Sequence, residues 1–238
     1  MAKRKIKVLK ITPHQEIAVL NTKGNCYIAV SVNNDFYKDK ENVSALLKFI
    51  KEHFFNCTIV VADFLYRHNL KIIKSNKKQI LSTNTDELGE KIIDFLNPLI
   101  ENDLDFFEIK RWKDYYSSKE FIVFKKKVME MYHSDIKFKS SILNTAKSFV
   151  QRLEKNQKLL IKDINIAVNH SVEFILEEII VFCILADKGL NIDIYPGTYL
   201  QVLKDISLGE FPISPVVLKN RISVEIKAIR KKPVANNV

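Results

Sequence analysis

The chain of 238 residues carries 38 Lys and Arg against 28 Asp and Glu, giving a formal net charge of +10 and a pI near 9.3. Apolar residues make up 47% of it, which is ample for a buried core. Only five glycines occur, and no glycine-rich phosphate-binding motif is present, so we expect no nucleotide cofactor held by such a loop. The charge favours a polyanionic partner, although an excess of solvated lysines would give the same total.

One domain over residues 1–238 is the simplest organisation, because no linker rich in Pro, Gly or Ser divides the chain. We expect the basic N-terminal segment and the tail 230–238 to be mobile. The cysteines stand alone without zinc-binding spacing, so we predict no metal site and a reducing, cytoplasmic setting. The apolar stretch around residues 174–185 is interrupted by glutamates and is too short to span a bilayer, so no membrane association is expected.

The first predicted elements form a strand–helix–strand unit. Residues 26–31 have the composition of a strand, residues 42–54 have apolar side chains at helical spacing, and residues 57–63 are a continuous apolar run. A strand that is apolar throughout is typical of a parallel sheet covered on both faces. The unit is therefore a βαβ unit.

The alternation of helices and strands continues along the chain. The further predicted helices are 84–97, 119–132, 138–153 and 172–186, and the further predicted strands are 104–109, 191–195 and an edge strand at 222–229. The sum predicts an α/β fold with a mainly parallel sheet sandwiched by helices. Ser31, Asp63 and Tyr195 each close a predicted strand, and ligands of such sheets bind beyond the carboxyl ends of the strands.

Two side chains stand out as candidates for chemistry. Ser31 is either a turn serine or a nucleophile whose oxyanion Asn33 and Asn34 would stabilise. Glu178 lies next to Glu177 in a helix whose other residues are almost all apolar. A solvated face is the simpler explanation for the two glutamates, but at least one should be partly buried, with a cation or a raised pKa.

These positions together resemble the cyclodipeptide synthases. The family's first motif, H-x-Φ-Φ-G-Φ-S with Φ for Val, Leu or Ile, ends in the nucleophilic serine, and here residues 25–31 are NCYIAVS. Its second motif is Y-Φ-x-x-E-x-P on a helix, and here residues 174–180 are FILEEII. The serine and the glutamate match as Ser31 and Glu178, whereas the motif tyrosine is Phe174. Tyr195 is followed directly by Pro196, as in one of the family's two branches, and Asn34 stands where the other branch keeps an asparagine.

The resemblance implies a Rossmann-like fold similar to the catalytic domains of class I aminoacyl-tRNA synthetases. It implies an aminoacyltransferase that joins two aminoacyl-tRNAs into a cyclic dipeptide through an aminoacyl-Ser31 intermediate, without cofactor or metal. Glu178 would anchor the substrate amine and Tyr195 would relay a proton. Further substrate contacts would come from Asn34, Phe174, Tyr27, Ala29, Val181 and Asp63. The bulk of Tyr27 would favour a small first amino acid, and Phe174 lacks the hydroxyl with which the family tyrosine holds the amine.

The tRNA would need a basic surface, and we expect the chain to act as a monomer. The candidate tRNA-binding residues are Lys110, Arg111, Lys113, Lys125, Lys126, Lys127, Lys147, Arg152 and Lys155. Two alternatives remain open. A non-catalytic RNA-binding α/β protein would explain the charge equally well, and another transferase on a Rossmann-like sheet would bind a small cofactor.

Overall fold

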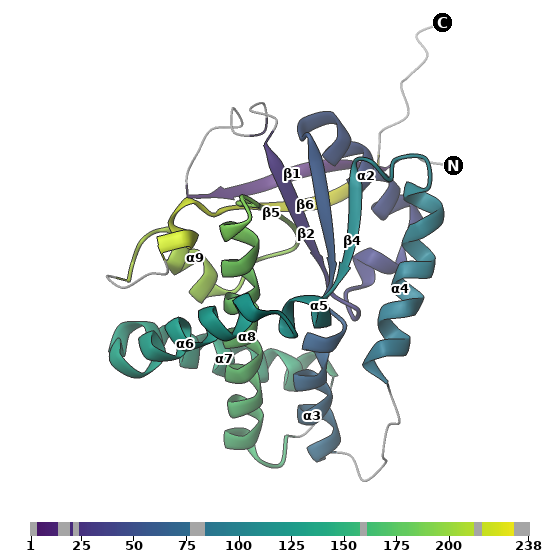
Figure 1. Cartoon of the computed structure of the whole chain (residues 1–238). Helices are drawn as coiled ribbons and strands as arrows, with labels where there is room; N and C mark the ends of the chain where they lie inside the picture. The colour runs from purple at the N-terminus through teal and green to yellow at the C-terminus, as the bar shows by residue number, and fades with distance from the viewer. Residues whose placement is uncertain are drawn as a thin grey trace, which may run out of the picture.

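The structure is a computed structural model that describes residues 4–13, 20, 24–76, 84–157, 161–211 and 216–230. Within these residues the strands form one six-stranded sheet. They are β1 (Arg4–Thr12), β2 (Asn25–Val30), β3 (Asn56–Val61), β4 (Phe107–Arg111), β5 (Ile192–Pro196) and β6 (Ile222–Arg230). The sheet and its helices can be followed in Figure 1.

The strand order is β1-β6-β5-β2-β3-β4, in which every neighbouring pair is parallel except β1 with β6. From β2 the chain adds β3 and β4 on one side and later returns to add β5 and β6 on the other. The strand order therefore reverses between β2 and β5, where a doubly wound sheet opens a crevice beyond the carboxyl ends of its strands. The predicted α/β fold with a mainly parallel sheet is confirmed.

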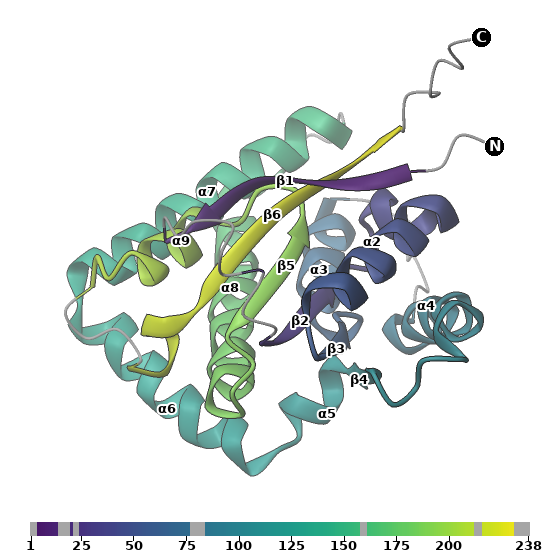
Figure 2. The same cartoon turned by 90° about the horizontal axis from the view of Figure 1, so that it is seen from above.

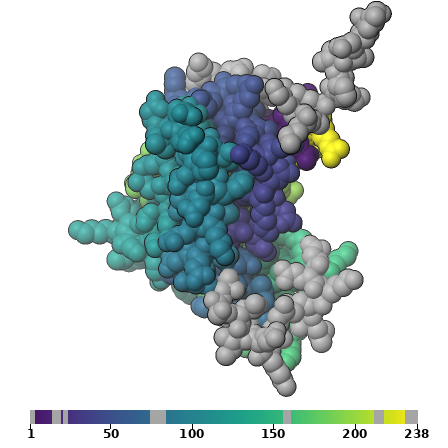
Figure 3. Space-filling model, turned by 90° about the vertical axis from the view of Figure 1, so that its right-hand side faces the viewer, coloured from purple at the N-terminus to yellow at the C-terminus, as the bar shows by residue number. Residues whose placement is uncertain are grey.

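The helices cover both faces of the sheet. The described helices are α2 (Lys40–His53), α3 (Arg67–Asn76), α4 (Thr85–Ile100), α5 (Trp112–Tyr116), α6 (Lys119–Ser134), α7 (Ile136–Gln157), α8 (Ile164–Asp187) and α9 (Gln201–Ser207), with 3-10 turns at η1 (Asp35–Lys38), η2 (Phe64–Tyr66) and η3 (Val216–Asn220). Apolar side chains of α2 and α4 build one core with the sheet, and those of α5 to α9 build the other. Figure 2 shows the two helical layers on either side of the strands. Figure 3 views the molecule from the right-hand side of Figure 1, where the first half of the chain forms most of the visible surface.

The longest helix, α8, is buried along most of its length. It begins at Asp163, whose side chain accepts a hydrogen bond from the Ile166 N–H at 3.0 Å, and it ends before Gly189, which has a φ of 81°. It packs against α3, α6 and α7, and its Phe182 ring contacts that of Tyr27 on β2. Among the residues that the structure describes, no helix is both long and apolar enough to cross a membrane.

The N-terminal segment departs from prediction. Arg4–Thr12 is not a mobile segment but the edge strand β1, paired antiparallel with β6. Its alternation explains this, because Ile6 and Val8 pack on the core while exposed lysines occupy the other face. The prediction that residues 222–229 form an edge strand is therefore wrong, because β6 lies between β1 and β5. The predicted mobile tail lies outside the described residues from 231 onwards.

Candidate active site

A cavity of about 170 Å³ lies at the point where the strand order reverses. Its walls come from the ends of β2 and β5, from η2 and α3, and from α7, α8 and α9. Apolar side chains such as Ile175, Phe182 and Leu203 form much of the lining, and Ser31, Glu178 and Tyr195 lie among them. A second opening of about 240 Å³ shares Ser31 and Tyr195 and also contains Asn33 and Asn34. Of the three strand-end residues that the sequence predicted near one crevice, Ser31 and Tyr195 line this cavity and Asp63 does not. Glu178, the candidate on α8, lies in the same cavity.

Ser31 stands between the inner cavity and the outer opening. It directly follows β2, and its backbone carbonyl accepts a hydrogen bond from the Asn34 N–H at 3.1 Å, which turns the chain away from the sheet. No hydrogen bond of its hydroxyl to another described residue is present. The hydroxyl is thus available at a position that a ligand can reach from outside.

Glu178 projects from α8 into the cavity without a hydrogen-bond partner. Its Oε2 atom is buried and makes no hydrogen bond to any described residue. Burial raises the pKa of the Glu178 carboxyl to about 8, and the nearby charge of Asp193 acts in the same direction. Such a carboxyl group can accept a hydrogen bond from a ligand donor or pair with a ligand cation.

The neighbouring Glu177 is fully paired and serves a different purpose. Its Oε1 accepts hydrogen bonds from Arg67 Nη1 at 2.7 Å and from Trp112 Nε1 at 2.9 Å, and its Oε2 pairs with Arg67 and His68. These hydrogen bonds lower the pKa of Glu177 and more than offset the effect of burial. Glu177 therefore fastens α8 to α3 and α5, and this leaves Glu178 facing the cavity.

Tyr195 is on β5 and lines the same cavity as Glu178 of α8. Burial raises the pKa of its phenol, the charge of Glu178 adds to this, and the side chain of Asn34 acts against it. The Asn34 amide is 3.4 Å from the Pro196 carbonyl, and Asn34 Oδ1 accepts from the Phe36 N–H at 3.0 Å. Asn34 thus ties the loop after Ser31 to the end of β5 and holds the two candidate catalytic side chains at one mouth.

The cavity contains three buried acceptor atoms that have no hydrogen-bond partner among the described residues. They are Glu178 Oε2, Asn69 Oδ1 and Asp193 Oδ1. Neither Asn69 nor Asp193 was predicted from the sequence. Phe174 also lines the cavity, and its ring stacks on Phe149 with a centroid distance of 6.4 Å. Because unpartnered buried acceptors are costly, the cavity is suited to a ligand with several N–H or O–H donors.

The floor of the cavity is a buried ion pair. Asp193 and Arg221 are each 1% exposed and are paired through Oδ2 and Nη2. Arg221 Nε also donates to the Tyr27 hydroxyl at 3.2 Å, while the Tyr199 hydroxyl donates to the Asp193 backbone carbonyl at 2.7 Å. The Arg221 guanidinium lies 5.0 Å from the ring centroid of Phe182 and 5.1 Å from that of Tyr199. This pairing was not anticipated, because the two charged residues are 28 positions apart.

Several predicted substrate contacts do not line the cavity. Ala29 does, but Tyr27 and Val181 are buried behind its walls. The expectation of a small first amino acid, which rested on the bulk of Tyr27, therefore has no support. Asp63 is 1% exposed and accepts from the Phe64 N–H and from Arg111 Nε, both at 2.7 Å. Its carboxylate serves to anchor η2 and β4 rather than a ligand.

The predicted basic residues fall into three groups. The first group, around Trp112, is in ion pairs: Lys110 with Glu108, Arg111 with Asp63, and Lys113 with Asp86. The Arg111 side chain is only 13% exposed. Lys125, Lys126 and Lys127 are exposed on α6, with Lys127 over the Phe124 ring. Lys147, Arg152 and Lys155 are exposed on α7, the helix that supplies Phe149 to the cavity.

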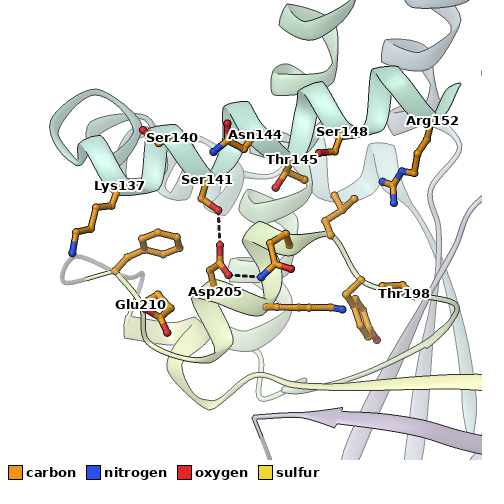
Figure 4. A pocket seen from close by; sticks show the side chains of 15 residues that line it. Lys137, Ser140, Ser141, Asn144, Thr145, Ser148, Arg152, Thr198, Asp205 and Glu210 are labelled. Atoms are coloured by element: carbon orange, nitrogen blue, oxygen red, sulfur yellow. Dashed lines mark hydrogen bonds between the residues drawn. The ribbon is translucent and has the colours of Figure 1, made fainter. Parts of the chain in front are cut away.

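A polar groove of about 630 Å³ adjoins the cavity. One wall is a stripe of small polar side chains on α7, from Ser140 to Ser148, with Lys137 and Arg152 at its ends (Figure 4). The other wall is α9, where Asp205 accepts hydrogen bonds from Ser141 and Gln201 at 2.6 and 2.7 Å. Thr198, Tyr199 and Leu200 line both the groove and the cavity. In the described residues, no group of three or more His, Cys, Asp or Glu is arranged to hold a metal ion.

Searches of the sequence against protein-family models and against curated proteins find no match. Several solved structures have a fold similar to that of this chain. A cyclodipeptide synthase from Fluoribacter dumoffii superposes with a TM-score of 0.70 at 22% identity, covering 95% of this chain and 100% of that one. A Mycobacterium tuberculosis protein, described as showing that cyclodipeptide synthetases are related to type I tRNA synthetases, gives 0.66 at 9% identity, with 97% and 94% covered. A synthase from Candidatus Glomeribacter gigasporarum bound to Phe-tRNA gives 0.53 at 16% identity, with 90% and 92% covered. At these identities the similarity establishes the fold, which this chain shares with cyclodipeptide synthases.

Proposed function

We propose that this chain is a tRNA-dependent cyclodipeptide synthase with Ser31 as its nucleophile. One observation carries the proposal. A serine at the reversal point of the sheet opens onto a cavity in which Glu178 and Asn69 present buried acceptor atoms that make no hydrogen bond to any residue the structure describes. An aminoacyl ester supplies what such a site lacks, namely an ammonium group close to an activated carbonyl. The fold shared with cyclodipeptide synthases supports the same conclusion.

In the first step the Ser31 hydroxyl attacks the ester carbonyl of an aminoacyl-tRNA. The bond from Oγ to the acyl carbon forms, the ester bond to the terminal ribose breaks, and the hydroxyl proton passes to the departing ribose oxygen. The ester is already activated, so the transfer requires no nucleotide hydrolysis. The backbone turn from Ser31 to Asn34 would present N–H groups to the developing oxyanion.

Glu178 would hold the amine of the bound aminoacyl group. The arriving ammonium favours the charged form of a carboxyl whose pKa is about 8 in the empty site. Phe174, which stacks on Phe149, offers no hydroxyl to this amine. Binding of the amine therefore depends on Glu178, with Asn69 as the other acceptor nearby.

Two further steps complete the product. The amine of aminoacyl-Ser31 attacks the ester of a second aminoacyl-tRNA, which releases that tRNA and leaves a dipeptide on Ser31. The free amine of this dipeptide then attacks the Ser31 ester, closes the six-membered ring and restores the serine hydroxyl. The Tyr195 phenol, whose pKa burial raises above its ordinary value near 10, is protonated at neutral pH, and it would pass a proton between the attacking amine and the departing oxygen.

The second substrate would approach along the polar groove, because the groove shares three residues with the cavity wall. Arg152 at its end, with Lys147 and Lys155 on the same helix, would contact the RNA backbone. The cations around Trp112 are engaged in ion pairs and are weaker candidates.

The deciding experiment is mass spectrometry of the culture medium from bacteria that express this chain, beside Ser31→Ala. We expect cyclic dipeptide masses only with Ser31 present. In parallel, the purified protein is mixed with a pool of charged tRNAs, and the Ser31 peptide is examined for an added aminoacyl mass. A soluble protein that binds tRNA but gives neither product nor acylated Ser31 would instead be a non-catalytic RNA-binding protein.

A further inference from the structure

The ion pair at the cavity floor has no role in the mechanism described above. Asp193 pairs in register with Tyr27, four residues before Ser31 along neighbouring parallel strands. At about 3.3 Å per residue, Asp193 therefore lies roughly 13 Å from the level of Ser31. Ala29 lies between these two levels along β2 and, like Ser31 and Asp193, lines the cavity. A side chain that extends from Ser31 along the cavity in this direction would approach Asp193.

Asp193 has one oxygen available for a ligand. Oδ2 is paired with Arg221, and the hydroxyls of Tyr27 and Tyr199 also lie close enough to this carboxylate to affect its pKa. Oδ1 is buried and, among the described residues, makes no hydrogen bond of good geometry. Asp193 is 1% exposed, so water does not satisfy this atom from the bulk. A buried acceptor left in this state costs free energy that a ligand donor would recover.

The charge of Asp193 is already balanced. Arg221 is equally buried, donates to Tyr27 and Ser223 as well, and is enclosed by the rings of Phe182 and Tyr199. A cationic side chain arriving at Oδ1 would place a second positive charge beside this guanidinium in a region shielded from water. An uncharged donor would satisfy Oδ1 without that repulsion.

From this geometry we propose that the first aminoacyl group has a long, uncharged side chain ending in a hydrogen-bond donor, and that Asp193 Oδ1 accepts from it. The inference rests on the proposed function. A phenol fits best, since the distance excludes short hydroxyl side chains and the walls between Ser31 and the floor are apolar at Ile175, Phe182 and Leu203. The cavity volume of about 170 Å³ is several times the roughly 30 Å³ of one water molecule.

The test compares two amino acids on the same tRNA. One tRNA is charged chemically with tyrosine or with phenylalanine, and single-turnover acylation of Ser31 is followed by the mass of its peptide. Lysine and leucine on the same tRNA serve as the cationic and apolar comparisons. We expect the tyrosyl group to be transferred about ten-fold faster or more, because a site built for a donor rejects the analogue that lacks it.

A double variant examines whether the floor is responsible. Asp193→Leu with Arg221→Met removes both charges together and leaves neither one unpaired. We expect it to lose the preference for tyrosine over phenylalanine. Lys91→Ala, at an exposed position of α4 that lines neither the cavity nor the groove, should keep the ratio.

The outcomes separate the inference from the function on which it rests. Equal rates, or faster transfer of phenylalanine, leucine or lysine, overturn the inference while acylated Ser31 still supports the synthase. Absence of any acyl group on Ser31 from a full pool of charged tRNAs overturns both. The wild-type ratio decides the matter even if the double variant fails to fold.

Discussion

Glu177 and Glu178 are neighbours in the chain, yet their carboxyl groups are in opposite situations. Glu177 is satisfied by Arg67, His68 and Trp112, and its pKa is lowered. Glu178 faces the cavity, its Oε2 has no hydrogen-bond partner within the described part of the chain, and its pKa is raised to about 8. Glu177 fixes α8 to its neighbouring helices, whereas Glu178 gives α8 an ionisable group in the cavity.

The raised pKa of Glu178 makes a prediction about stability. In the folded protein this carboxyl keeps its proton up to about pH 8, whereas in the unfolded chain it ionises near 4.5. Folding stability should therefore fall as pH rises between these values. Glu178→Gln removes this loss, so we expect it to raise the unfolding free energy by roughly 1–3 kcal/mol at pH 8.5 and to change it little at pH 4.5.

Thermal unfolding at the two pH values measures this difference, with Glu177→Gln as the matched control. The pKa of Glu177 is lowered, so its contribution is present above its ordinary pKa and lost as the solution becomes more acid. Glu177→Gln should accordingly lower Tm at pH 8.5. An equal effect of the two substitutions at that pH would show that the pKa of Glu178 is not raised in the folded protein.

The sequence marks Ser31, Glu178 and Tyr195 as candidate catalytic residues, because each stands at a strand end or in an apolar helix and matches the resemblance. That the three line one cavity is an observation of the structure. Sequence reasoning could not distinguish the two glutamates by burial, since their partners lie 65 to 110 residues away. It also missed Asp193. Alternation in a strand indicates which face a side chain takes, but not that a distant arginine lies behind it.

At the scale of elements, continuous apolar runs and helical spacing predicted most of the sheet and the long helices. Those signals failed for β1, whose lysines concealed a strand with one buried face, and for α3, which was not predicted as a helix. The N-terminal third of α8 was also missed, since the predicted helix begins at residue 172 and the structure begins it at Ile164. Each of these elements is defined by tertiary partners more than by its own pattern.

The contact between α4 and η2 depends on a single glycine. A Cβ atom at Gly89 would lie 2.1 Å from Asp63 Oδ2 and 2.7 Å from Arg111 Nη2. Gly89→Ala must therefore displace α4 or separate the buried Asp63–Arg111 pair. We expect destabilisation by about 1–3 kcal/mol, although alanine favours helix elsewhere.

Urea unfolding of this variant, with Lys91→Ala on the exposed side of α4 as its control, gives the comparison. Lys91→Ala should leave the midpoint nearly unchanged. If Gly89→Ala were as stable as that control, the close approach of α4 to Asp63 would not exist in solution.

At the scale of the whole molecule, the cations behind the net charge of +10 differ in how available they are to bind RNA. The cations around Trp112 are neutralised locally, whereas Arg152 and Lys155 on α7 are exposed beside the site. We expect Arg152→Glu with Lys155→Glu to weaken tRNA binding at least ten-fold and to reduce the salt dependence by roughly one ion per lost phosphate contact.

Binding is measured by fluorescence titration with labelled tRNA at several salt concentrations. Lys5→Glu with Lys7→Glu on β1 makes the same change in net charge on two exposed residues of the edge strand. That control should retain most of the affinity. Equal losses in both double variants would mean that total charge, rather than the α7 surface, governs the interaction.

The pairing of β1 with β6 joins residues from the two extremes of the described chain, with Arg4 opposite Arg230. Chains are synthesised from the N-terminus, and strand pairings between such distant residues form late. Arg221, which immediately precedes β6, arrives at the same stage. The Asp193–Arg221 pair and the β1–β6 pairing can therefore form only after nearly all of the described chain has been synthesised.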